Sequence, residues 1–266
     1  VRMKTQFLCI AIGHCSACGS SDAATSSGVS NLSLTIAGAY ETYPHQDGFS
    51  GQTAERVTAG LRGLELIDDA GGTWVLFDAS PSNLTADYSA STPTLLATIE
   101  PADVRPGRYV KARMVQDWSR FEVAATLHEA GTAAAGTLRV LQATSEGAVV
   151  EGKSLEQGHY EHAFSGSGVE RSYDGVLPVP EHSATAEAEA FDEQGVWAVY
   201  FPVAIEVPAG AKGELAIRVS LDRAFRWSEL GSADFTSGAY DIAPPIYEPV
   251  EQFGGNRFSA ALSLRR

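Results

Sequence analysis

The fold class of this chain is decided by the stretch Trp197-Ala198-Val199-Tyr200-Phe201-Pro202-Val203-Ala204-Ile205. Large apolar side chains stand at every second position, which is the period of a β-strand that buries one face. The turn-forming residues Pro208-Ala209-Gly210 follow, and the alternation resumes at residues 215–221. We therefore expect two strands, the second of which pairs back on the first in an antiparallel sheet.

The same alternation recurs along most of the chain. Further strands are expected at residues 32–36, 57–66, 73–77, 94–99, 109–115, 121–127 and 138–140. Arg62-Gly63 indicates a bulge, and Asp68-Asp69-Ala70-Gly71-Gly72 indicates a hairpin turn. Residues 130–136 are expected to form a loop, and residues 183–190 either a weak helix or a strand. Sustained helical periodicity is absent from the sequence, so we predict an all-β fold, an antiparallel β-sandwich that occupies residues 31–266.

The N-terminal region has the composition of an export signal. Two basic residues, Arg2 and Lys4, precede an apolar run at residues 7–13, and the small residues Ser16-Ala17 stand before Cys18. This order resembles a bacterial lipoprotein signal, although Cys15 takes the place where such signals usually carry leucine. The resemblance implies an export signal at residues 1–17, lipidation of Cys18 and a disordered, flexible tether at residues 18–30. The alternatives are an ordinary secretory signal cut near Ala17 and a buried N-terminal strand.

Charge and cysteine usage narrow the classes of partner. The formal net charge is −14 at pH 7, which disfavours nucleic acid and electrostatic docking to anionic lipid. Membrane attachment is therefore expected through the acyl chains of Cys18. The three cysteines, Cys9, Cys15 and Cys18, all precede the domain expected at residues 31–266, so that domain is expected to hold no disulfide and no cysteine-ligated metal.

Two segments carry a family resemblance. Residues 61–114 contain a bulged strand, a hairpin with Trp74, and the Pro106-Gly107-Arg108-Tyr109 entry into the next strand. This path resembles uncharacterised β-sandwich domains of bacterial envelope lipoproteins, which are similar to transthyretin-like and immunoglobulin-like sandwiches. The run Ala224-Phe225-Arg226-Trp227, followed by Tyr247-Glu248-Pro249-Val250, is similar to the closing segment of predicted lipoproteins in predatory soil bacteria. The resemblance implies a fold and an envelope location, and it supplies no catalytic residue.

The segment His159-Tyr160-Glu161-His162 is the candidate metal site, because imidazoles beside a carboxylate are good ligands for zinc, copper or nickel. On a helical turn the two histidines would share a face, whereas on a strand they would point to opposite faces. His128 and His182 are candidates for additional ligands. The competing interpretation is two solvated loop histidines, and we predict no obligatory cofactor.

Catalytic patterns are weak. The acidic residues Glu187, Glu189, Asp192 and Glu193 suit a glycosidase pair, a calcium site or a solvated surface. The sequence contains no Gly-x-Ser-x-Gly elbow. We therefore predict no catalytic residues and no enzymatic activity.

The aromatic C-terminal region offers a candidate binding platform. Trp227, Tyr240 and Tyr247 stand there among prolines, either as a satellite core or as exposed rings that stack on a glycan. The predicted function is a lipid-anchored binding or structural module of the cell envelope, on the periplasmic or outer face. The alternative is a metal-binding or small-molecule-binding protein, with carbohydrate among the ligands. An envelope protein or a glycan is the expected partner.

Overall fold

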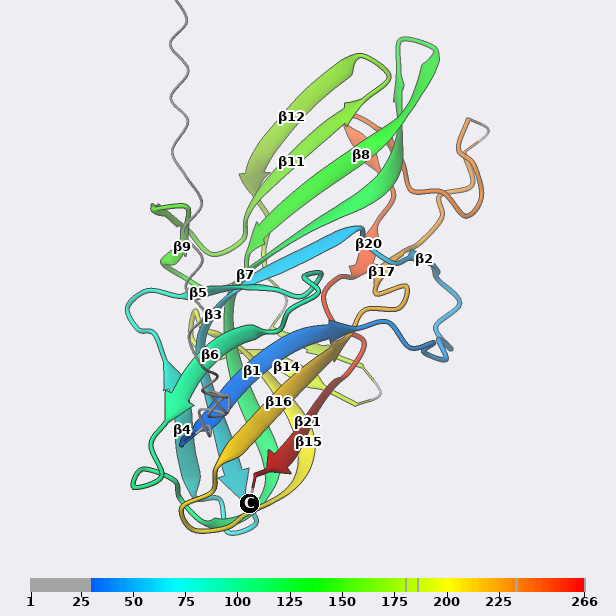
Figure 1. The fold of residues 1–266 in the computed structure, drawn as a ribbon. Helices are drawn as coiled ribbons and strands as arrows, with labels where there is room; N and C mark the ends of the chain where they lie inside the picture. The colour runs from blue at the N-terminus through cyan, green and yellow to red at the C-terminus, as the bar shows by residue number, and fades with distance from the viewer. Residues whose placement is uncertain (1–29, 180, 186, 233, 266) are drawn as a thin grey trace, which may run out of the picture.

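The computed structural model describes residues 30–179, 181–185, 187–232 and 234–265. The predicted export signal, Cys18 and the predicted tether up to residue 29 lie outside the described residues. Every regular element within the described part of the chain is a β-strand, which confirms the all-β prediction. Figure 1 shows these strands arranged as sheets that face one another in the manner of a sandwich.

The larger sheet is built around its longest strand, β7. The path through this sheet runs β12 (Val169–Val176), β11 (His159–Gly166), β8 (Thr132–Ala143), β7 (Gly107–Glu129), β15 (Trp197–Val207), β14 (Glu189–Asp192) and β13 (His182–Ala184). On the other side of β7 lie β3 (Arg56–Asp68), which carries β4 (Thr73–Asp78) and β5 (Leu84–Asp87), and β18 (Asp241–Ala243), which carries β19 (Ile246–Tyr247). The sheet is antiparallel except where β18 runs parallel to β7.

Three smaller sheets complete the part of the chain that the structure describes. The second layer of the sandwich has the order β21 (Phe258–Leu264), β16 (Gly213–Ser220), β1 (Leu32–Ala39) and β6 (Thr94–Ile99). The short sheets are β2 (Ser50–Gln52), β17 (Phe225–Trp227) and β20 (Val250–Gln252), and the hairpin of β9 (Ala148–Val150) with β10 (Lys153–Leu155). Within the second layer β1 and β16 run parallel, although their neighbours pair antiparallel.

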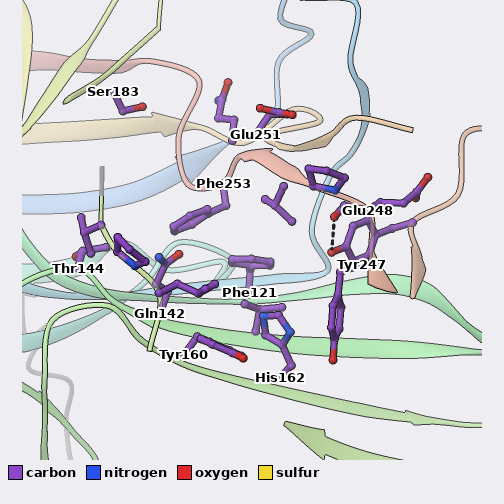
Figure 2. A pocket seen from close by; sticks show the side chains of 18 of the residues that line it. Phe121, Gln142, Thr144, Tyr160, His162, Ser183, Tyr247, Glu248, Glu251 and Phe253 are labelled. Carbon is purple, nitrogen blue, oxygen red and sulfur yellow. Dashed lines mark hydrogen bonds between the residues drawn. The ribbon is translucent and has the colours of Figure 1, made fainter. Parts of the chain in front are cut away.

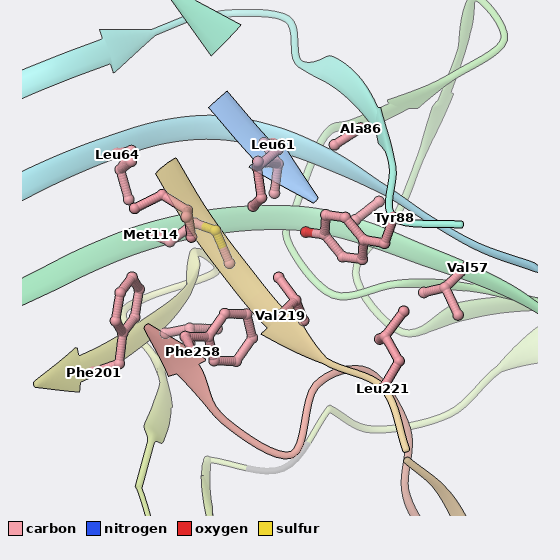
Figure 3. Packing of buried hydrophobic residues seen from close by; sticks show 14 of the residues in the cluster. Val57, Leu61, Leu64, Ala86, Tyr88, Met114, Phe201, Val219, Leu221 and Phe258 are labelled. Atoms are coloured by element: carbon pink, nitrogen blue, oxygen red, sulfur yellow. The ribbon is translucent and has the colours of Figure 1, made fainter. Parts of the chain in front are cut away.

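The main core lies between the two layers. Leu32, Leu34 and Ile36 of β1 are fully buried against the larger sheet, and each such side chain contributes about 1.5–3 kcal/mol. Figure 3 shows Phe201 of β15 and Phe258 of β21 meeting in this core, and their ring centroids lie 5.4 Å apart. The alternating apolar residues of each strand therefore point inward, as the sequence predicts.

The predicted hairpin at residues 197–221 is wrong. The two strands lie in different layers, because β15 pairs with β7 and β14 whereas β16 pairs with β1 and β21. Residues 208–212 cross from one layer to the other. Both strands still bury their apolar faces, since they face the same core from opposite sides, so alternation alone cannot distinguish this arrangement from a hairpin.

The predicted loop at residues 130–136 is also wrong. The turn consists of Ala130 and Gly131, with φ values of 51° and 77°, and β8 begins at Thr132. The small residues suit a close approach of two strands: a side chain on Gly136 would meet the Gly166 backbone of β11 at 2.7 Å. The small residues that suggest a loop in this segment instead allow two strands to pack closely.

Several other predictions hold with small changes. Residues 94–99 form β6, residues 73–77 pair with β3 as a hairpin, and the register of β3 shifts around residues 61–63 as the bulge requires. The two strands expected at residues 109–115 and 121–127 are one continuous strand, β7. Residues 183–190 contribute to two short strands, β13 and β14, instead of a helix.

Candidate functional site

A cavity of about 600 Å³ lies beside the half of the larger sheet that contains β8 and β11 (Figure 2). Its floor comes from β7, β8 and β11, and its other walls come from residues 177–179, Ser183, Trp197 and residues 240–253. The lining residues are Gln116, Phe121, Val140, Gln142, Thr144, Tyr160, His162, Leu177, Pro178, Val179, Ser183, Trp197, Tyr240, Pro245, Tyr247, Glu248, Pro249, Val250, Glu251, Gln252 and Phe253.

Strand register places the floor residues. His162 of β11 lies opposite Val140 of β8, and Tyr160 lies opposite Gln142. Phe121 of β7 lies on the other side of Val140. Because side chains two residues apart on a strand share a face, Tyr160 and His162 both point toward the cavity. Figure 2 shows them below Gln142 and Phe121.

The opposite wall is held by two buried carboxylates, Asp241 and Glu248. The backbone N–H groups of Asp241 and Leu230 donate to the Glu248 carboxylate at 2.9 and 3.2 Å. Burial raises the pKa of Glu248, the two backbone donors oppose that shift, and the Asp241 and Glu229 carboxylates add to it. The Tyr240 hydroxyl donates to the Glu248 carbonyl at 3.1 Å, which fixes the segment that carries Tyr247.

His162 is a neutral side chain between two tyrosines. Its ring centroid lies 4.9 Å from that of Tyr160 and 5.6 Å from that of Tyr247. Burial lowers the pKa of His162 from 6.5 to about 4, so the imidazole is uncharged at neutral pH. Its buried Nδ1 has no hydrogen-bond partner among the described residues.

The predicted histidine pair does not converge on one ion. Because β11 is a strand, His159 and His162 point to opposite faces, and His159 Nε2 lies 3.5 Å from the Glu161 carboxylate on its own face. Within the described part of the chain no group of three His, Cys, Asp or Glu side chains is placed to hold a metal. His128 Nε2 is bonded to Asp241 Oδ1 at 2.7 Å, and the side chain of His182 lies outside the described residues.

The predicted aromatic platform is corrected in two of its three members. Trp227 is 0% exposed and Tyr240 is 2% exposed, and their rings pack edge to face with centroids 5.6 Å apart. They belong to the core because β17 and the following segment cover the sheet. Tyr247 is half-buried and lines the cavity, as Tyr240 also does.

The acidic segment does not form a carboxylate pair across a cleft. Glu193 accepts hydrogen bonds from Arg113 and from the Tyr200 hydroxyl, and Glu187 lies 3.8 Å from Arg257. Sequence reasoning missed Phe121 and Gln142 as site residues. The shared strand face of Tyr160 and His162 was a usable signal, whereas Phe121 and Gln142 lie on β7 and β8, whose place beside β11 no local pattern identifies.

Comparisons with known proteins add little to this description. No known family matches the chain, and no curated protein matches it. A solved structure, MbnP from Methylosinus trichosporium, is 11% identical with a TM-score of 0.30, over 72% of this chain and 75% of that chain. Among the described residues, no helix has the length and apolar character to cross a membrane.

Proposed function

We propose that this protein is a non-catalytic binding module of the cell envelope that takes up a small organic molecule in the cavity. The cavity is the observation that carries the proposal. Its volume of about 600 Å³ falls in the range typical of small-molecule sites, which is about 300–1,000 Å³. Aromatic and aliphatic side chains form most of its lining, with a few polar groups among them, as in such sites generally.

The rim of the cavity favours a ligand with an apolar body. Leu177 is 53% exposed and Val250 is 38% exposed, and both line the cavity. The adjacent Val176 and Ile246 are exposed as well. Apolar side chains grouped around a cavity are typical of an interaction site, because covering them removes apolar surface from water.

The polar groups support binding in preference to catalysis. Glu248 already accepts two backbone hydrogen bonds, and His162 is too weak a base to take up a proton near neutral pH. Among the described lining residues no serine, threonine or cysteine is hydrogen-bonded to a histidine, as an activated nucleophile would be.

The anchor belongs to the same proposal. Lipidation of Cys18 would hold the domain at a membrane surface, and the tether that follows would let it move. Twelve residues of flexible chain have a root-mean-square span of about 20 Å. The order of basic, apolar and small residues before Cys18 and the acidic charge of the chain support this part of the proposal.

Ligand-detected NMR on the full chain with a library of small aromatic and aliphatic compounds tests the binding function. Gln142→Trp would fill the cavity from β8. Arg139→Trp places the same side chain on the opposite face of that strand and is the matched control. We expect compounds that bind the wild type and Arg139→Trp but not Gln142→Trp. Equal binding to all three proteins, or no binding to any, would contradict the proposal.

A further inference from the structure

The charged side chains among the described residues that line the cavity are acidic. Its charged lining residues are Glu248 and Glu251, and neither lysine nor arginine occurs among the described residues that line it. His162 adds no positive charge at neutral pH, because burial holds its pKa at about 4. An anionic ligand would therefore face two carboxylates with no compensating cation.

Aromatic rings surround the same space. Phe121, Tyr160, Tyr247 and Phe253 stand around the cavity in Figure 2. The centroids of Phe121 and Phe253 lie 5.5 Å apart, and Tyr247 packs against His162 at 5.6 Å. The negative face of an aromatic ring attracts a cation, and several rings together can enclose an ammonium group.

Several polar groups of the lining are engaged within the protein. Thr144 Oγ1 donates to the Gln116 carbonyl at 2.8 Å, and Gln116 Nε2 donates to Ser119 Oγ at 2.7 Å. Gln252 Nε2 donates to Asn256 Oδ1 at 3.1 Å. These bonds reduce the number of groups left to bind the hydroxyls of a sugar, whereas a quaternary ammonium group requires no hydrogen bond.

We propose that the ligand of this cavity is an organic cation, with a protonated amine or a quaternary ammonium group on an apolar body. This inference rests on the proposed function, since it names the ligand class of the same cavity. The aromatic rings enclose the cationic group, and the exposed carboxylate of Glu251 attracts it. Glu251 Oε1 accepts from Ser228 Oγ at 2.6 Å, which holds this carboxylate at the rim.

Isothermal titration calorimetry on the full chain tests the ligand class with choline and its neutral carbon isostere, 3,3-dimethyl-1-butanol. These probes differ in charge and have nearly the same shape. We expect choline to bind about tenfold more tightly than the alcohol, the difference that a desolvated cation–π contact supplies. Maltose, as a sugar probe, is expected not to compete.

Substitutions test which residues of the cavity bind choline. Tyr247→Leu should weaken choline binding about tenfold, while Tyr247→Phe keeps the ring and should retain the affinity. Glu251→Gln should weaken choline binding about threefold and leave the alcohol unaffected. Glu206→Gln removes an exposed carboxylate of β15, outside the cavity lining, and is the matched control. Thermal melting verifies that each variant is folded.

The outcomes separate this inference from the proposed function. If choline and the alcohol bind equally and Gln142→Trp abolishes both, the cavity binds small molecules and the cation proposal is overturned. Tighter binding of maltose than of choline would also overturn it, in favour of a sugar ligand. If choline does not bind while compounds of the NMR library do, only the cation proposal fails. If nothing binds in either experiment, both proposals fail.

Discussion

Gly60→Ala gives a quantitative test of how the hairpin of β9 and β10 is attached to the sheet. The Trp118 indole of β7 lies directly over Gly60 of β3. A Cβ at Gly60 would stand 2.1 Å from Trp118 Nε1 and 2.5 Å from Cδ1, where ordinary contacts are about 3.5–4.0 Å. The indole must therefore move by about 1.5 Å to accept a methyl group.

That displacement would break the two hydrogen bonds of the indole. Trp118 Nε1 donates to the Val149 carbonyl at 3.0 Å and to Asn83 Oδ1 at 3.3 Å. Each bond contributes about 1 kcal/mol, and overpacking adds about 1–3 kcal/mol. We expect Gly60→Ala to lower the free energy of unfolding by about 3–5 kcal/mol, or the melting temperature by about 9–15 °C for a domain of this size.

Urea denaturation of the full chain, followed by tryptophan fluorescence, measures the loss. Gly63→Ala is the matched control on the same strand, because its Cβ would meet nothing closer than the Phe77 carbonyl at 3.4 Å. In a Trp118→Leu background the cost of Gly60→Ala should shrink, since the displaced indole is gone. The reasoning is refuted if Gly60→Ala is as stable as Gly63→Ala, or if its cost is unchanged in that background.

Three further predictions concern the anchor, the cavity and the core. Cys18→Ser should move the protein from the membrane to the soluble fraction and abolish palmitate labelling, whereas Cys15→Ser should do neither; retention of the label in Cys18→Ser would exclude that anchor. The pKa of His162 is about 4 in the folded protein and near 6.5 when unfolded, so the unfolded chain binds more protons between these values and stability falls as the pH drops through them. His162→Phe should remove about 2 kcal/mol of that acid sensitivity in urea denaturation at pH 7 and pH 4.5, and an unchanged pH dependence would contradict the burial of His162. Trp227→Ala should cost about 3–5 kcal/mol because its side chain is fully buried, and a loss below 1 kcal/mol would favour the exposed platform instead.

Strand positions could be predicted from the sequence, but most strand partners could not. Alternation at residues 32–36 identifies β1 and its buried face. It does not indicate that β1 pairs in parallel with β16, which lies 181 residues later in register at Leu32 and Gly213. Any two strands with a matching apolar face satisfy the same pattern, so pairing over that separation depends on the packing of the whole core.

The cavity was predictable only in part, for the same physical reason. Tyr160 and His162 are two residues apart, and a strand assignment alone places them on one face. Tyr247 was identified through its aromatic neighbours. Whether the Trp227 side chain is buried or exposed depends on which segment covers it, and tertiary packing determines that segment. The cavity exists because residues 240–253 pass over β8 and β11, a contact between segments far apart in the chain.

The length of β7 has a consequence for how the molecule unfolds. Residues 107–115 of this strand pair with β15, whereas residues 118–129 pair with β8, and β3 borders both stretches. The sandwich and the sheet that floors the cavity therefore share one continuous strand. Unfolding of either half would break hydrogen bonds of the same strand, so we expect the two halves to unfold in a single cooperative transition. Hydrogen exchange should accordingly report one slow class of amides along the whole of β7.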